Sequence, residues 1–296
     1  MNILLIGCGR TGRAIAENLL DLKFVDKLFL YSRTTKTSKS LSYDLDNRKV
    51  KVVDEIKALK NIDYIIITLS GMSDSAREES FFKRKSTYEV RQDELKFNIG
   101  AITHLIEDLR TFSNKTSIIV VTNPVDEITN YLRILLNREN ILGFGLELDA
   151  KRYEKTLGKK VYCIGTHGKA IPLINEKNEK IYNDLSKKVD SALLDYIRNH
   201  GIPHKMAGIN FREFFEKLNT QEKEVIHVSF YIKKKFLGVE EVSISLPCIV
   251  RKGKVLDTAK MKINEIEKKR FIESVNELKK SVNHIIETHK KLVDYK

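Results

Sequence analysis

The glycine pattern near the N-terminus, in the stretch MNILLIGCGRTGRAIAENLL, constrains the fold of this chain more than any other feature. The apolar residues 3–6 have the length of a buried strand, and the apolar residues within 14–20 recur with helical spacing. Three glycines separate these segments in the order G-x-G-x-x-G, which lets the backbone approach a pyrophosphate at the positive end of a helix. We therefore predict a dinucleotide-binding turn rather than a tight turn without a ligand. The residues predicted to contact the cofactor here are Gly7, Gly9, Arg10, Thr11 and Gly12.

Short apolar runs and helical segments alternate in the first half of the chain. After the first strand, further strands are predicted at residues 27–32, 51–53, 64–69 and 117–121. This alternation predicts an α/β fold, a Rossmann-type doubly wound parallel sheet that binds ligands at the carboxyl ends of its strands. A chain of 296 residues is long enough for two lobes. We predict a dinucleotide-binding domain over residues 1–142 and a second domain, of α+β type, over residues 143–296.

Two patterns describe the second domain. Residues 242–246 (VSISL) alternate between apolar and polar, which predicts a strand with one face in water. From residue 263 onwards, apolar residues recur at alternating intervals of four and three, which predicts a long helix with an apolar face. We expect that face to lie in the core or in a subunit interface. It consists of Phe271, Val275, Leu278, Val282 and Ile285.

The residues after the second predicted strand indicate which dinucleotide binds. In NAD-binding folds, an acidic side chain roughly 20 residues beyond the glycines accepts hydrogen bonds from the ribose hydroxyls. Here the sequence has Ser32, Arg33 and Thr34, without a carboxylate. A guanidinium pairs with a 2′-phosphate in bidentate fashion, and the two hydroxyls add donors. We therefore predict NADP as the cofactor, with NAD as the alternative if this loop is only a solvated basic segment.

The net charge of +13 is compatible with binding either nucleic acids or small anions. The lysines are spread along the chain, and no dense basic block is interleaved with aromatic residues. We therefore expect a Lys-rich surface with an anion-binding cleft, and no nucleic-acid partner.

The cysteines and the hydropathy pattern indicate a compartment. Cys8, Cys163 and Cys248 are widely spaced and form no C-x-x-C pair, which argues against disulfides and a zinc site. No stretch reaches the ~18 consecutive apolar residues of a membrane span, and the N-terminus lacks the layout of a signal peptide. We expect a cytoplasmic protein with neither a membrane partner nor a bound metal.

Five stretches of the sequence carry motifs that can be compared with a known family. TNPVDEITNYL (residues 122–132), GFGLELDAKRY (143–153) and GTHGKAIPLI (165–174) are three of them. VRQDELKFNIG (90–100) matches a helix pattern R-x-D-L-x-x-x-N, apart from one position, and VSISLPCIVRKGKVLD precedes the long C-terminal helix. These stretches resemble the motifs of the lactate/malate dehydrogenases, in that family's order and over nearly the whole chain.

The resemblance implies reversible hydride transfer between a nicotinamide cofactor and an L-2-hydroxy acid, with residues 143–296 as the catalytic domain that binds the substrate. His167 is the expected acid–base residue, because imidazole titrates near neutral pH, and Asp149 is expected to orient it. Arg152, three residues from Asp149 on one helix face, is expected to bind the substrate carboxylate. Arg91 would polarise the keto oxygen after loop closure, and Asn123 would hold the substrate oxygen and the nicotinamide region. The other cofactor contacts that the resemblance implies are Asn98 and Val121.

The segment before Arg91 departs from the family. Residues 70–91 form a loop roughly a dozen residues longer than usual, and loops of this length are often lids or mobile segments. The family's substrate-discriminating position, six residues before the arginine, corresponds to Lys85. A cation there would pair with the second carboxylate of malate or oxaloacetate. If the FFKRK run is only solvated, the site would be neutral, as in lactate-type enzymes.

The histidine motif also departs from the family, with Thr166 and Lys169 in the places of Glu and Asp. Both changes remove negative charge beside His167, which is expected to lower its pKa. Pro203 stands where a small or hydroxylated residue often lines the family's pocket. The leading interpretation is a malate/oxaloacetate dehydrogenase that prefers NADP and forms a homodimer or homotetramer. The alternatives are an L-lactate or other L-2-hydroxy-acid dehydrogenase, an NAD-dependent glycosidase of related fold, and a nucleotide-binding protein without turnover.

Overall fold

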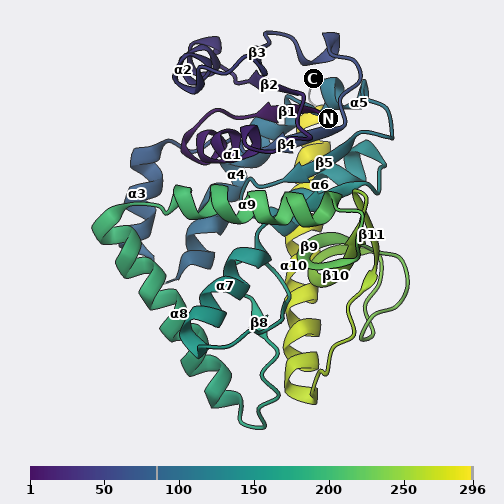
Figure 1. The fold of residues 1–296 in the computed structure, drawn as a ribbon. Helices are drawn as coiled ribbons and strands as arrows, with labels where there is room; N and C mark the ends of the chain where they lie inside the picture. Colours follow the sequence, from purple (N-terminus) through teal and green to yellow (C-terminus); the bar gives the residue numbers. More distant parts are fainter. Residues whose placement is uncertain (85, 295–296) are drawn as a thin grey trace.

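The computed structural model describes residues 1–84 and 86–294 of the chain (Figure 1). Its main sheet has nine strands in the described residues, in the order β11-β10-β9-β6-β5-β4-β1-β2-β3, and β7 pairs with β8. The strands are β1 Asn2–Ile6, β2 Lys27–Tyr31, β3 Val50–Val52, β4 Tyr64–Ile67, β5 Ser117–Val120, β6 Ile141–Gly143, β7 Cys163–Ile164, β8 Ile171–Pro172, β9 Glu224–Ile232, β10 Val242–Arg251 and β11 Lys254–Thr258. The helices are α1 Arg10–Leu20, α2 Thr35–Leu45, α3 Asp74–Lys83, α4 Thr87–Thr103, α5 Ile106–Arg110, α6 Val125–Leu136, α7 Leu146–Leu157, α8 Glu179–His200, α9 His204–Asn219 and α10 Glu265–Asp294, with a 3₁₀ turn at Ile56–Ala58.

Strands β1 to β6 are parallel and lie side by side in the order β3-β2-β1-β4-β5-β6, which is the order of a dinucleotide-binding sheet. Alternate residues of β1 enter two different cores. Ile3 and Leu5 pack in the same apolar cluster as Ile15 of α1, whereas Leu4 packs with Ile128 of α6 on the other face. Helices therefore cover both faces of the parallel strands, which confirms the predicted doubly wound fold.

The antiparallel strands β9, β10 and β11 continue the sheet beyond β6, through the pair Gly143 and Ser229. The prediction of one wet face for residues 242–246 is wrong, because Ser243 and Ser245 are both 0% exposed. The backbone of Ser243 exchanges two hydrogen bonds with the side chain of Asn130, at 2.7 and 2.8 Å. The polar face of this strand is therefore buried against α6, where Asn130 pairs with the backbone of Ser243 and Asp126 accepts from the hydroxyl of Ser245. The hydroxyl of Ser243 has no hydrogen-bond partner among the described residues.

The apolar face of α10 belongs to the core. Phe271 and Val275 are 0% exposed, and the rest of the predicted stripe is also buried. This helix packs against α6 and spans the molecule beside the sheet (Figure 1). Of the two locations predicted for the stripe, the core is confirmed.

The segment predicted as a long loop, residues 70–91, folds largely as helix, so that expectation is wrong. Ser73 caps α3 by accepting a hydrogen bond from the backbone N–H of Ala76, and Ser86 caps α4 in the same way through Glu89. In Figure 1, α3 lies near the corner where α8 meets α9, and it packs against α4 and α8. The inserted residues thus form an ordered helix beside the carboxyl ends of the parallel strands.

None of the helices in the described part of the chain combines the length and the apolar character that a membrane crossing requires. The three cysteines are all buried and free.

Candidate active site

The glycine turn joins β1 to α1 at the carboxyl end of the parallel strands. A Cβ atom at Gly7 would lie 2.5 Å from the backbone nitrogen of Leu69, and one at Gly12 would lie 2.0 Å from the carbonyl oxygen of Gly7. These two glycines therefore allow close packing of β1, β4 and α1. At Gly9, in contrast, a Cβ atom would meet no other atom within 4 Å. Gly9 is the N-cap residue of α1, so the open space lies at the helix N-terminus, where a pyrophosphate would bind.

Arg10 and Thr11 connect this turn to distant helices. The guanidinium of Arg10 lies 3.4 Å from Asp74 and 3.7 Å from Glu78, both on α3. The hydroxyl of Thr11 lies 3.0 Å from Nδ1 of His204, the first residue of α9. The structure therefore places α3 and the start of α9 next to the predicted pyrophosphate site.

The residues predicted to select the cofactor follow β2, the strand beside β1. The hydroxyl of Ser32 donates to the carbonyl oxygen of Thr34, which is the N-cap residue of α2, at 2.8 Å. The side chain of Arg33 is exposed and forms no ion pair within residues 1–84 and 86–294. Pro203 is the N-cap residue of α9 and so lies close to the glycine turn.

His167 lies in the turn between β7 and β8, and Asp149 lies on α7. Nδ1 of His167 donates to Asp149 at 2.7 Å, and the same carboxylate oxygen accepts from the backbone N–H of Gly168 at 2.8 Å. His167 is 6% exposed and Asp149 is 5% exposed. A Cβ atom at Gly145 would lie 2.6 Å from the His167 ring, so the imidazole packs directly on that backbone. Nδ1 is thus fixed by the carboxylate, which leaves Nε2 for proton transfer.

The electrostatics of this pair depend on burial and on the neighbouring arginines. Burial lowers the pKa of His167 to about 4, the charge of Arg91 lowers it as well, and the carboxylate of Asp149 opposes both. Burial alone would raise the pKa of Asp149, but His167, Arg152 and Arg91 hold that pKa well below its usual range. In the absence of ligands, the pair therefore consists of a neutral imidazole and a carboxylate.

The changes at Thr166 and Lys169 contribute less than the sequence suggested. Lys169 pairs with Glu277 at 2.6 Å on the surface, and Thr166 is a buried, uncharged residue. The predicted lowering of the pKa of His167 is confirmed, but burial and Arg91 are its main causes.

Two arginines lie next to the pair. Arg152, which follows Asp149 by three residues on α7, donates to its second carboxylate oxygen at 2.7 Å. Arg91 of α4 is 7% exposed and donates to the hydroxyl of Thr87 at 3.1 Å. A Cβ atom at Gly168 would lie 2.1 Å from Nη1 of Arg91, which places this guanidinium against the turn of His167. The structure thus brings the two arginines together with the histidine and its carboxylate.

Asn123 follows β5 at the same edge of the sheet as the glycine turn, and Val121 lies half-buried two residues before it. The carbonyl oxygen of Asn123 accepts a hydrogen bond from Nδ2 of Asn98 at 2.6 Å. Oδ1 of Asn98 accepts another from the backbone N–H of Gly71 at 2.7 Å. The side-chain oxygen of Asn123 is buried and has no hydrogen-bond partner in the described part of the chain. A buried acceptor of this kind is suited to a hydroxyl or amide of a bound ligand.

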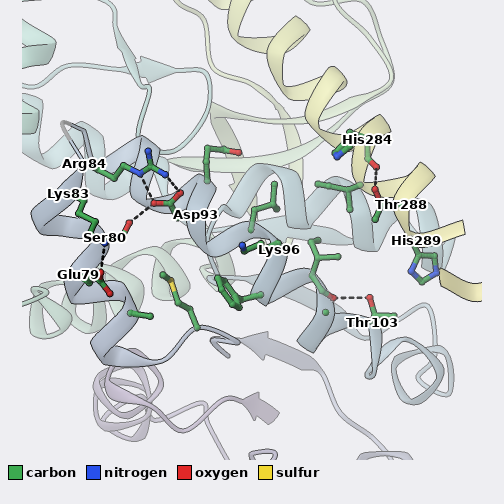
Figure 2. Close-up of a pocket in the computed structure, with 18 residues that line it drawn as sticks. Glu79, Ser80, Lys83, Arg84, Asp93, Lys96, Thr103, His284, Thr288 and His289 are labelled. Atoms are coloured by element: carbon green, nitrogen blue, oxygen red, sulfur yellow. Dashed lines mark hydrogen bonds and ion pairs between the residues drawn. The ribbon is translucent and has the colours of Figure 1, made fainter. Parts of the chain in front are cut away.

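Lys85, the residue predicted to select the substrate, lies outside the residues that the structure describes. Its neighbour Arg84 pairs with Asp93 of α4 at 2.5 Å, and both border a groove of about 740 Å³ between α3, α4 and α10 (Figure 2). Asp93 lies two residues after Arg91, so the two side chains leave opposite sides of α4. The charge of Arg84 is therefore directed to the groove in Figure 2 and not to the surroundings of His167.

Two further carboxylates near the site were missed by the sequence analysis. Asp126 of α6 is buried and accepts hydrogen bonds from the backbone N–H of His167 and from the hydroxyl of Ser245, each at 2.8 Å. It belongs to the TNPVDEITNYL stretch, but only the fold shows which residue it contacts. Glu94 of α4 is buried and forms an ion pair with Arg77 of α3. Its signal is visible in the sequence, because Glu94 takes the place of Leu in the pattern R-x-D-L-x-x-x-N.

Two family models match most of the chain. The model of the lactate/malate dehydrogenase NAD binding domain matches residues 1–138, and that of the lactate/malate dehydrogenase alpha/beta C-terminal domain matches residues 148–289. Among curated proteins, L-lactate dehydrogenase 2 of Lactococcus lactis subsp. lactis is 24% identical, with 96% of this chain and 98% of the relative covered. The L-lactate dehydrogenase of Shouchella clausii is 26% identical, with 68% and 70% covered.

Solved structures show the same fold. L-lactate dehydrogenase from Clostridium thermocellum superposes with a TM-score of 0.73 at 22% identity, over 96% of this chain and 98% of that one. Malate dehydrogenase from Aeropyrum pernix superposes with a TM-score of 0.76 at 18% identity, over 95% and 97%. On the basis of the two family models, this chain belongs to the lactate/malate dehydrogenase family.

Proposed function

We propose that this chain is a dehydrogenase that transfers a hydride between a nicotinamide cofactor and an L-2-hydroxy acid. The observation that carries the proposal is the buried pair of His167 and Asp149 with Arg152 and Arg91 next to it. These groups supply an acid–base residue, its orienting carboxylate and two cations for a substrate carboxylate and a developing oxyanion. The family models support the same class of reaction.

Each residue has a defined task in this proposal. The glycine turn and the N-terminus of α1 hold the pyrophosphate, and the nicotinamide, when bound, supplies or accepts the hydride. Nε2 of His167 exchanges a proton with the substrate oxygen, while Asp149 stabilises the imidazolium. Arg152 binds the substrate carboxylate, and Arg91 stabilises negative charge on the keto oxygen. Asn123 offers its unpaired side-chain oxygen to the substrate hydroxyl or the carboxamide.

The pKa of His167 predicts opposite pH profiles for the two directions. Reduction of a keto acid needs the imidazolium, whose fraction falls tenfold for each pH unit above a pKa of about 4. For the free enzyme, kcat/KM of reduction is therefore expected to rise about tenfold per unit as the pH falls from about 8 to about 5. Oxidation of the hydroxy acid needs the neutral ring and should stay flat over that range. Initial rates at constant ionic strength test this, and a plateau of the reduction profile near pH 7 would contradict it.

We further propose that the cofactor is NADP, with NAD as the alternative. Support comes from the residues after β2, which include Arg33 and two hydroxyl side chains but no carboxylate. The exposed guanidinium of Arg33, without an ion pair in the described residues, is available for a 2′-phosphate. The residues assigned to this part of the site are Ser32, Arg33 and Thr34.

Replacing Arg33 with aspartate is expected to reverse this preference. The change removes a charge-assisted contact to the 2′-phosphate, adds repulsion, and restores an acceptor for ribose hydroxyls. The ratio of kcat/KM for NADPH over NADH should fall by about a hundredfold, measured with a single keto acid. Lys39→Asp, the same charge change at an exposed position on α2, is the matched control and should leave the ratio nearly unchanged. An equal ratio in the Arg33 variant and the wild type would disprove the assignment.

Malate and oxaloacetate are the substrates that we propose first, because a cation at Lys85 would bind their second carboxylate. L-lactate and pyruvate are the second candidate. One argument for them is that Arg84 faces the groove of Figure 2 and pairs with Asp93, so its charge is not directed to a second carboxylate of the substrate. Another is that the curated relatives are named L-lactate dehydrogenases. Oxidation of NADPH and NADH with oxaloacetate and with pyruvate tests both. Faster turnover of oxaloacetate would support the role of Lys85. A preference for pyruvate would contradict that role and leave the roles assigned to the catalytic residues unchanged.

We also propose a cytoplasmic homodimer or homotetramer, with the cofactor-binding domain ending near residue 142. The ranges of the two family models support this boundary. Light scattering of the purified protein measures the oligomeric state, and a monomer in solution would refute the proposed homodimer or homotetramer.

A further inference from the structure

One face of α4 carries the polar side chains of the candidate site. Arg91, Glu94 and Asn98 follow one another at intervals of three and four residues, and all three are buried. Such spacing places them on the same side of the helix. Glu94 therefore lies between the arginine assigned to the substrate and the asparagine that contacts Asn123.

The partner of Glu94 comes from the inserted helix. Arg77 of α3 donates to the Glu94 carboxylate, and the two side chains are 13% and 5% exposed. The same guanidinium donates to the hydroxyl of Ser70, just after β4, and lies 3.4 Å from Asp74. The two departures from the family are thus complementary, because the insertion supplies the cation Arg77 and the position of the family's Leu supplies the anion Glu94.

Glu94 also contacts the candidate site itself. Burial raises the pKa of Glu94, whereas Arg77, Arg91 and a hydrogen bond from the side chain of Asn123 oppose that rise. An amide that donates to Glu94 through Nδ2 presents its Oδ1 elsewhere, and Oδ1 of Asn123 is the buried acceptor without a partner. With Nδ2 turned towards Glu94, Oδ1 of Asn123 stays open for a ligand.

A second connection runs beside the first. The backbone N–H of Gly71 donates to Asn98, and Asn98 donates to the backbone of Asn123, at 2.7 and 2.6 Å. The segment that leads into α3 is thus tied to Asn123 through the main chain as well. These two bonds reach the backbone of Asn123, whereas among the described residues the contact with Glu94 reaches its side-chain amide.

We propose that Glu94 is a positioning residue that fixes the side-chain amide of Asn123 and, through Arg77, makes that orientation depend on the docking of α3. The inference rests on the proposed function, in which Asn123 touches the substrate and the nicotinamide. Without Arg77, the buried carboxylate would lose its hydrogen-bonded counter-charge and keep only the charge of Arg91, so the amide would lose an acceptor that is held in place. In its docked position, the inserted helix therefore completes the set of contacts around Asn123.

Four variants test this proposal. Glu94→Leu restores the family residue, Arg77→Leu removes the cation, the double variant removes the pair, and Glu79→Gln breaks an exposed ion pair with Lys83 elsewhere on α3 as the control. Each single change in the Arg77–Glu94 pair is expected to lower kcat by about tenfold to a hundredfold, because a small displacement of a catalytic group has effects of this size. KM for the keto acid and the cofactor dissociation constant should stay within about threefold. The double variant should lose no more than the worse single variant, and Glu94→Gln should recover part of kcat because it keeps an acceptor.

Hydrogen–deuterium exchange of α3 gives a readout that needs no turnover. Amides of residues 74–83 are expected to exchange faster in Glu94→Leu and Arg77→Leu, and to be unchanged in Glu79→Gln. Unchanged exchange in the Glu94 variant, additive losses of kcat, or a lower Tm with normal kcat would overturn the proposal. A large increase in the cofactor dissociation constant with normal kcat would also overturn it. Absence of wild-type turnover with every keto acid would instead count against the proposed function, since exchange reports on α3 independently.

Discussion

Replacing His167 with alanine is expected to lower kcat by about a thousandfold to ten-thousandfold and to leave cofactor affinity nearly unchanged. The imidazole is the group that we assign to proton exchange with the substrate oxygen, and Asp149 holds its other nitrogen at 2.7 Å. The glycine turn that we assign to the cofactor lies on separate elements, β1 and α1, and does not depend on the ring. Initial rates measure kcat, and titration calorimetry measures the cofactor dissociation constant.

His227 offers a matched control for this experiment. It is also buried, at 6% exposure, and its Nδ1 lies 2.7 Å from the carboxylate of Glu147. Its Nε2, however, accepts a hydrogen bond from the backbone N–H of Cys163 and so has a structural partner. His227→Ala should lower Tm while kcat stays within a few-fold of the wild type. Equal losses of kcat in both variants, or near-normal turnover in His167→Ala, would show that the assigned mechanism is wrong.

Replacing Arg152 with leucine is expected to lower kcat/KM for the keto acid by about a hundredfold to ten-thousandfold. Two charge-assisted hydrogen bonds to a carboxylate are worth about 3–6 kcal/mol together, and about 1.4 kcal/mol corresponds to a factor of ten. KM should carry most of the change. A smaller decrease in kcat is also expected, because Arg152 donates to Asp149 and helps to keep the pKa of that carboxyl low.

The adjacent Lys151 provides the control for Arg152. It lies on the same helix, is 40% exposed, and pairs with Glu213 at 3.6 Å on the surface. Lys151→Leu removes one positive charge without touching Asp149, and its kcat/KM should stay within a few-fold of the wild type. If Arg152→Leu leaves KM at the wild-type value, the substrate carboxylate binds elsewhere.

Local patterns in the sequence predict those parts of the structure that are determined by residues close together in the chain. The glycine turn, the apolar strands and the helical spacing of Asp149 and Arg152 each depend on neighbouring residues, and the structure has them as expected. The apolar stripe of α10 is similar, because a helical period needs no knowledge of the partner surface. The resemblance to the family supplied the remaining candidates, and the fold brings His167 and Arg91 to the same place.

The parts that could not be predicted depend on contacts between distant segments. The strand at residues 242–246 reads as half-exposed, because its alternation does not reveal that α6 carries Asp126 and Asn130 to bind its serines. Residues 70–91 were predicted to be a loop because they are longer than the corresponding loop of the family. Their two serine caps, however, favour two helices. The ion pair of Arg77 and Glu94 joins residues 17 apart on two helices, and no spacing rule links them.

The most direct test of the central claim is to follow the hydride itself. The protein is incubated with a reduced nicotinamide cofactor that carries deuterium at C4 in the transferred position, together with oxaloacetate or pyruvate. Mass spectrometry of the product measures where the deuterium goes. A dehydrogenase of the proposed kind places one deuterium at C2 of an L-2-hydroxy acid, and His167→Ala abolishes that product. A hydroxy acid without deuterium at C2, or a cofactor that keeps its label with every keto acid, would contradict the account.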